Sequence, residues 1–265
     1  MIAATVLAIV ATLAPPAPNA PIPREPAALA STLDATDAGL EAAIDGWTHR
    51  ERGGPPRDVT LYALYQQRIY IVLTKRPPLA KAVLERLPKR RAAHLRDTLG
   101  ARARLITLAT PRPRSAFRIG KPRPAAALLA YYREAERHFG VAWSVLAAVN
   151  LVESAFGKLR NTSTAGAQGP MQFMPATWRA YGLGGNVNDA HDAILGAANY
   201  LRASGAPRSY RRALYAYNRS DAYVDGVLLY ARRMRADPRA FLGYYSWQVF
   251  VRTPSGLRRL TGPGL

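Results

Sequence analysis

The chain has 265 residues, of which 49% are hydrophobic and 20% are charged. This composition excludes an intrinsically disordered chain and leaves room for a buried core, and the absence of cysteine excludes disulfides and thiolate metal sites. The net charge of +20, mostly from arginine spread along the chain, indicates attraction to an anionic partner; an arginine excess set by codon composition is the alternative explanation.

The first predicted segment, residues 1–30, resembles a signal peptide followed by a Pro-rich linker. Residues 2–13 are apolar and too few to span a bilayer, which suits the h-region of a signal peptide, although no Lys or Arg precedes them. A disordered apolar tail and a misplaced start codon are the alternatives. No later segment is long and apolar enough to cross a membrane. We therefore expect an exported protein, located in the cell wall or secreted, without a stable membrane span.

Residues 31–110 carry the spacing of a helical N-terminal region. Ser31 or Thr32 is the expected cap of the first helix, and Asp58 that of the second. A third helical pattern runs through residues 83–87, and a basic fourth helix is expected over residues 89–108. The region has no chemical signature of its own, so we interpret it as a helical layer that supports the rest of the chain.

Residues 111–124 contain four prolines and five basic residues and are predicted to form a linker. Helical spacing resumes at residue 125, and Gly140 is the expected end of that first helix. Further helices are predicted over residues 141–154, 175–181, 188–201, 209–217 and 221–235. Together these make residues 125–236 a second helical domain.

Residues 237–265 have a different pattern. Hydrophobic and polar side chains alternate over residues 244–252 as in a strand, residues 253–256 are typical of a turn, and residues 257–260 are the expected returning strand. The predicted fold is thus mainly α, with a small C-terminal β-hairpin.

Glu153 is the strongest candidate for chemistry because it ends an almost wholly apolar helical stretch, residues 141–152. Burial of a carboxyl group raises its pKa, and a carboxyl group that stays protonated near neutral pH is suited to act as a general acid. The loop after this helix contains Gly166 and Gly169, which allow close backbone approach, and Gln172, whose amide suits sugar hydroxyl and acetamido groups. The hydroxyl of Tyr217 is a candidate to orient the carboxyl group.

Three motifs carry a resemblance to a known family. Glu153-Ser154, the segment Gly166-Ala-Gln-Gly-Pro-Met-Gln-Phe-Met-Pro175, and Ala216-Tyr-Asn218 resemble, in order and approximate spacing, the motifs of soluble-type (SLT-domain) lytic transglycosylases of the goose-type-lysozyme-like superfamily. The C-terminal segment is also similar to hairpins that follow this domain in some actinobacterial members. The resemblance covers about residues 125–234 and implies a lysozyme-like helical fold that cleaves bacterial peptidoglycan.

The resemblance also implies roles for individual residues. Glu153 matches the single catalytic acid/base, and Tyr217 the tyrosine that hydrogen-bonds its carboxyl group. The implied substrate-binding residues are Ser163, Gln172, Met174 and Asn218.

One carboxyl group is expected to suffice because the substrate supplies the nucleophile. Glycosidases usually employ two carboxyl groups, but Asp189 and Asp192 fit helix capping better than catalysis. In the family, the acid protonates the bond between MurNAc and GlcNAc and then takes the proton of the C6 hydroxyl, leaving a 1,6-anhydroMurNAc end. A hydrolytic muramidase and a non-catalytic cell-wall-binding module are the alternatives.

The expected partners follow from these inferences. They are peptidoglycan glycan strands and other anionic wall polymers; nucleic acid is not expected because no nucleic-acid-binding motif accompanies the charge. The four histidines lack metal-ligand spacing, so no metal and no cofactor are predicted, and the protein is expected to be a monomer.

Overall fold

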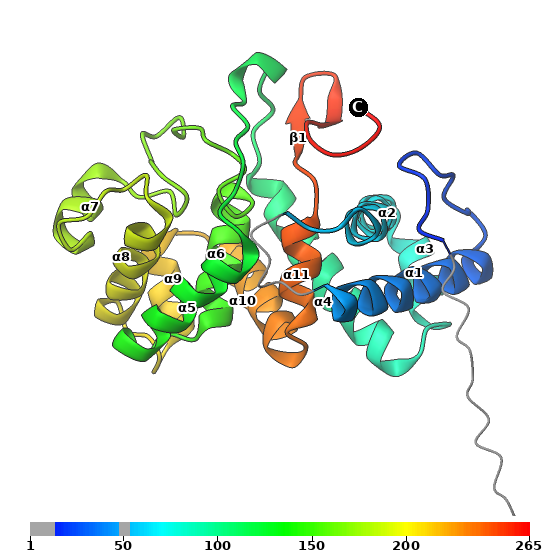
Figure 1. Ribbon diagram of the computed structural model, residues 1–265, viewed down its shortest axis with the longest axis horizontal. Coiled ribbons are helices and arrows are strands. Elements are labelled where there is room, and N and C mark those ends of the chain that lie inside the picture. Colours follow the sequence, from blue (N-terminus) through cyan, green and yellow to red (C-terminus); the bar gives the residue numbers. More distant parts are fainter. Residues whose placement is uncertain (1–13, 48–53) are drawn as a thin grey trace, which may run out of the picture.

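The computed structural model describes residues 14–47 and 54–265. The predicted signal-like apolar run, residues 2–13, lies outside the described residues. Within the described part the chain is mainly helical and ends in one two-stranded antiparallel sheet, which confirms the predicted fold class (Figure 1).

Four helices form the described part of the N-terminal region, which lies on the right in Figure 1. They are α1 (Pro26–Gly46), α2 (Arg57–Thr74), α3 (Pro77–Leu84) and α4 (Lys89–Leu105), and the 3-10 turn η1 (Ile106–Leu108) follows.

The first helix begins earlier than its apolar spacing predicts. Its N-cap is Glu25, whose carboxylate accepts hydrogen bonds from the backbone N–H groups of Ala27 and Ala28. Pro26 suits the first helical position because its ring fixes φ and no N–H is needed there. The expected cap at Ser31 or Thr32 was therefore wrong. Asp58 likewise lies inside the first turn of α2 rather than at its cap.

The second half of the described chain contains seven helices and the hairpin. After the 3-10 turn η2 (Arg114–Ala116), these are α5 (Ala125–Phe139), α6 (Trp143–Ser154), α7 (Pro175–Tyr181), α8 (Ala190–Ala203), α9 (Tyr210–Tyr217), α10 (Asp221–Ala236), α11 (Arg239–Ser246), β1 (Phe250–Thr253) and β2 (Gly256–Arg259). Gly140 ends α5 at φ 69°, and Asp189 caps α8, as expected.

The C-terminal hairpin is shorter than predicted. Tyr244, Tyr245 and Ser246 belong to α11, and the strand starts only at Phe250, which pairs with Arg259. The alternation over residues 244–252 includes a helical part because Phe241, Tyr244 and Tyr245 lie three and four positions apart, and all three are buried on α11.

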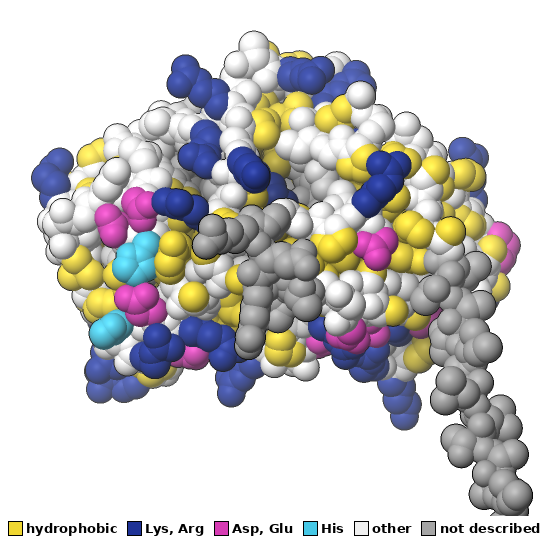
Figure 2. All heavy atoms as spheres, in the orientation of Figure 1, with side chains coloured by type: hydrophobic (Ala, Val, Ile, Leu, Met, Phe, Trp, Pro, Cys, Tyr) yellow, Lys and Arg dark blue, Asp and Glu magenta, His cyan; other side chains and the backbone are white. Residues whose placement is uncertain are grey.

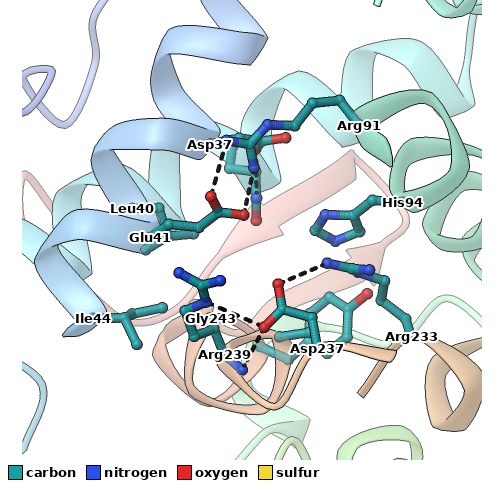
Figure 3. A pocket seen from close by; sticks show the side chains of 13 residues that line it. Asp37, Leu40, Glu41, Ile44, Arg91, His94, Arg233, Asp237, Arg239 and Gly243 are labelled. Atoms are coloured by element: carbon teal, nitrogen blue, oxygen red, sulfur yellow. Dashed lines mark hydrogen bonds and ion pairs between the residues drawn. The ribbon is translucent and has the colours of Figure 1, made fainter. Parts of the chain in front are cut away.

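A single cluster of buried side chains runs from Leu29 in α1 to Trp247 after α11. The two halves of the chain meet near the middle of Figure 1, where α4 of the first half lies beside α10 of the second half and α11 is nearby. Ion pairs reinforce this junction: Arg90 on α4 bridges Glu41 on α1, at 2.9 Å, and Asp237, at 3.4 Å. Asp237 also pairs with Arg233 and Arg239, as Figure 3 shows.

Candidate active site

A groove of about 500 Å³ contains the predicted catalytic residue. Part of its lining comes from the end of α6, the end of α9 and helix α10, with Leu151, Val152, Glu153, Ala155, Asn218, Tyr223 and Tyr230. Another part comes from α4, η1 and the hairpin with the residue before it, with Arg102, Leu105, Ile106, Leu108, Val249, Phe250, Val251 and Leu257.

Hydrogen bonds connect the hairpin to η1 and to the segment before α5. The backbone N–H of Arg112, in the segment before α5, donates to the carbonyl of Arg252 on β1 at 3.1 Å. The guanidinium of Arg252 donates in turn to the carbonyls of Ile106 and Ala109. These bonds explain why the segment before α5 and the hairpin rise together at the top of Figure 1.

Glu153 lies in the last turn of α6, which is otherwise buried along most of its length. Its side chain is half-buried at the groove, and the hydroxyl of Tyr223 donates a hydrogen bond of 2.6 Å to its Oε1. Burial raises the pKa of Glu153 to about 7, and the hydrogen bond from Tyr223 opposes part of that rise. Near neutral pH the carboxyl group is therefore present in both its protonated and its ionised form.

The backbone turns sharply immediately after this helix. Ala155, Phe156 and Gly157 have φ values of 51°, 63° and 81°. The first two are non-glycine residues in the left-handed region, which costs about 1–3 kcal/mol for each. The turn is held by bonds from the N–H of Ala155 to the carbonyl of Leu151 and from Phe156 to Asn150, so the direction of the chain beside the carboxyl group is fixed.

A buried polar network connects the catalytic helix to the Gly-rich loop. The hydroxyl of Tyr132 donates to Oδ1 of Asn150 at 2.6 Å, and Nδ2 of Asn150 donates to the carbonyl of Pro170 at 2.8 Å. The hydroxyl of Ser154 donates to the same carbonyl and accepts from the N–H of Gly157. The serine of the Glu-Ser pair therefore serves to anchor the loop, since it is fully buried.

The Gly-rich loop is fixed by its own contacts. At Gly169, which has φ 73°, a Cβ atom would lie 1.8 Å from the carbonyl oxygen of Val187, so only glycine fits. Oγ of Ser163 accepts from the N–H of Ala167 at 2.9 Å, and Nε2 of Gln172 donates to the carbonyls of Asn161 and Gly169. These side-chain groups are engaged within the loop.

The structure brings only part of the predicted site together. Glu153 and Asn218 line the groove, whereas Ser163, Gln172 and Met174 are not among the described residues that line it. The side chain of Met174 is 43% exposed.

The predicted hydrogen bond from Tyr217 to Glu153 is replaced by one from Tyr223. The hydroxyl of Tyr217 donates instead to the carbonyl of Met171, at 2.7 Å. Tyr223 lies in the first turn of α10, whose N-cap is Ser220. In the sequence, the helical spacing of Tyr223 and Tyr230 predicts that both side chains are buried, but it does not predict a contact with Glu153. No local pattern in the sequence indicates which of the two tyrosines points at the carboxyl group.

Among the described residues that line the groove, Glu153 is the one acidic side chain. Asp189 caps α8 through hydrogen bonds to the N–H groups of His191 and Asp192, and Asp221 and Asp225 pair with Arg211. In the described part of the chain no three His, Asp or Glu side chains gather as metal ligands would. Nor does any described helix have the length and apolarity needed to cross a membrane.

Comparison with known proteins finds similarity over the part of the chain that contains Glu153 and Tyr223. Residues 130–235 match the family described as Transglycosylase SLT domain. The chain is also 28% identical over 130 residues to a protein named membrane-bound lytic murein transglycosylase F, from Thiobacillus denitrificans. The alignment covers 46% of this chain and 27% of that relative, so the chain spans about a quarter of the relative's length. No solved structure gives a significant match.

Proposed function

We propose that the protein is a peptidoglycan lytic transglycosylase that cleaves the MurNAc–GlcNAc β-1,4 bond with Glu153 as its acid and base. The observation that carries the proposal is the half-buried carboxyl group in the groove, with a pKa of about 7 and the Tyr223 hydroxyl on one oxygen. The matching SLT domain, residues 130–235, contains both residues and supports the same activity.

The proposed reaction needs no second carboxylate. Protonated Glu153 gives its proton to the glycosidic oxygen while the bond from that oxygen to C1 of MurNAc breaks. The C6 hydroxyl oxygen of the same MurNAc then bonds to C1, and the carboxylate takes the hydroxyl proton. The acid is regenerated and water is not consumed. Because Tyr223 is bound to Oε1, Oε2 is the oxygen that transfers the proton.

The residues implied by the family resemblance take different roles in this proposal. Asn218 contacts substrate from the groove wall. Ser163 and Gln172 hold the loop in shape, in agreement with their hydrogen bonds, and the exposed Met174 is the loop side chain that meets a sugar. Tyr217 supports the loop beneath the carboxyl group through its bond to Met171.

The protein's charge fits a substrate outside the cell. We propose that the protein is exported and that its positive charge draws it to an anionic wall. Lys and Arg side chains lie at several places along the upper and lower edges of the face in Figure 2 rather than in one patch. Such a distribution favours general attraction, which salt weakens, over recognition of one polymer.

The test is mass spectrometry of the soluble products that wild-type protein and Glu153→Gln release from purified sacculi. Anhydro-muropeptides from wild type, and at least a thousandfold fewer from Glu153→Gln, are expected. Glu85→Gln, which removes an exposed carboxylate outside the groove, is the matched control and retains activity. Reducing ends instead would identify a hydrolytic muramidase. Sacculus binding without products would identify a wall-binding module.

A further inference from the structure

The groove contains a cation that the reaction proposed above does not use. Arg102 lies in the last turn of α4, outside the matching SLT domain, and is among the residues that line the groove. The groove's other arginine, Arg252, is occupied by the carbonyls of Ile106 and Ala109. Arg102 is therefore the groove arginine whose role is not explained by contacts within the groove wall.

The groups around Arg102 are neutral. Its Nε donates to the hydroxyl of Thr74 at 3.4 Å, its guanidinium lies 5.8 Å from the centre of the Trp247 ring, and the Tyr230 hydroxyl is a further hydrogen-bond partner. Among the ion pairs of the described residues, none involves Arg102. On the same helix, Arg90, Arg91 and Arg104 each pair with a carboxylate. Arg96 has no ion pair in the described part of the chain either, but its side chain is exposed to water, whereas Arg102 is half-buried.

The environment makes an unpaired cation costly. The apolar residues Leu105, Ile106, Val249 and Val251 line the same groove, and burial lowers the pKa of Arg102. A charge that is partly removed from water without a counter-ion is destabilising, and an incoming anion at such a place gains more than it would in water. Glu153 is not that anion, because no cation contributes to its pKa shift.

We infer that Arg102 binds a carboxylate of the peptide stem carried by the glycan strand in the groove. The inference rests on the proposed function, which supplies the strand, and adds that the enzyme recognises acyl-peptide substituents as well as sugars. The planar guanidinium suits two parallel hydrogen bonds to a carboxylate. The apolar side chains beside it suit the methyl groups of a short alanine-containing peptide.

The test compares two versions of one substrate. The free amino groups of peptide-bearing glycan strands are first blocked by N-acetylation. One half of the preparation is then treated with carbodiimide and ammonia, which converts its carboxylates to amides, so the two substrates differ only in their carboxylates. Wild type is expected to cleave the free-acid strands about tenfold to a hundredfold faster in kcat/KM, the range of a charge-assisted bidentate contact. Arg102→Met should cleave both versions at the amidated rate.

The control is Arg104→Met, which removes a cation from the same helix outside the groove and should keep the preference. Equal wild-type rates on the two substrates, or an equal loss on both in Arg102→Met, would overturn the inference. Anhydro products from neither substrate would instead contradict the proposed function. In that case, equilibrium binding tests the role of Arg102 without turnover. The Glu153→Gln protein is expected to bind the free-acid strands more tightly than the amidated strands, and the double variant Glu153→Gln, Arg102→Met is expected to bind the two equally. Any other result would overturn the inference.

Discussion

Ionisation of Glu153 should make the folded protein less stable as the pH rises. Its pKa is about 7 in the folded state against 4.5 for a free side chain. Between these values the unfolded chain loses the proton and the folded chain keeps it, so the free energy of unfolding falls with pH. One pKa unit corresponds to about 1.36 kcal/mol, so the free energy of unfolding falls by about 3 kcal/mol between pH 4.5 and pH 8.

Glu153→Gln removes this dependence while it keeps the shape and an acceptor oxygen for Tyr223. The variant should match wild type near pH 4.5 and exceed it by about 3 kcal/mol above pH 7, or about 6–12 °C in Tm for a chain of this size. Urea unfolding at half-unit steps from pH 4.5 to 8.5 measures the difference, which cancels all other titrating groups. Glu85→Gln should follow wild type throughout. A constant difference over this range would refute the raised pKa.

Three further predictions concern the surroundings of the carboxyl group. Tyr223→Phe should shift the acidic group in the pH–rate profile upward and lower kcat about tenfold, while Tyr217→Phe leaves that pKa in place. Gly169→Ala should lower the free energy of unfolding by about 2–4 kcal/mol in urea titrations, and Gly166→Ala, where open space surrounds the new methyl group, by about 1 kcal/mol. Thermal scans should show wild type gaining stability relative to Lys158→Met as the pH rises from 7 to 10. Burial lowers the pKa of Lys158 to about 7, so in this range the unfolded chain holds a proton that the folded chain has lost, and the free energy of unfolding rises with pH. The neutral amine still donates hydrogen bonds to the carbonyls of Tyr245 and Trp247.

Much of the fold follows from local sequence patterns. The helices that were predicted well have an apolar stripe and an end signal that acts locally, such as Gly140 after α5 and Asp189 before α8. The start of α1 was missed because Glu25 rarely serves as a cap and the Pro-rich stretch hides it. The alternating pattern predicts Tyr244 in a strand because aromatic residues are enriched in strands. The same side chain is buried on α11, where its spacing from Phe241 also fits a helix.

Only the site residues that belong to sequence motifs could be predicted. Glu153 was identified because burial of a carboxyl group on an apolar helix is visible in the sequence. Its partner Tyr223 is 70 residues away and reaches it only through the packing of α10 against α6. Arg102 belongs to a region without motifs, and its place in the groove that contains Glu153 depends on the long-range contact of α4 with α10.

The shared core of the two halves has a consequence for producing the SLT region on its own. The SLT match covers residues 130–235, yet most of the residues that line the groove lie outside it, and α10 packs against α4 and η1. A gene fragment that encodes the matched residues alone would leave an apolar flank of α10 in water and one side of the groove missing. We therefore expect a chain truncated to residues 130–235 to lose stability and activity, because the groove needs the N-terminal helices and the hairpin as well.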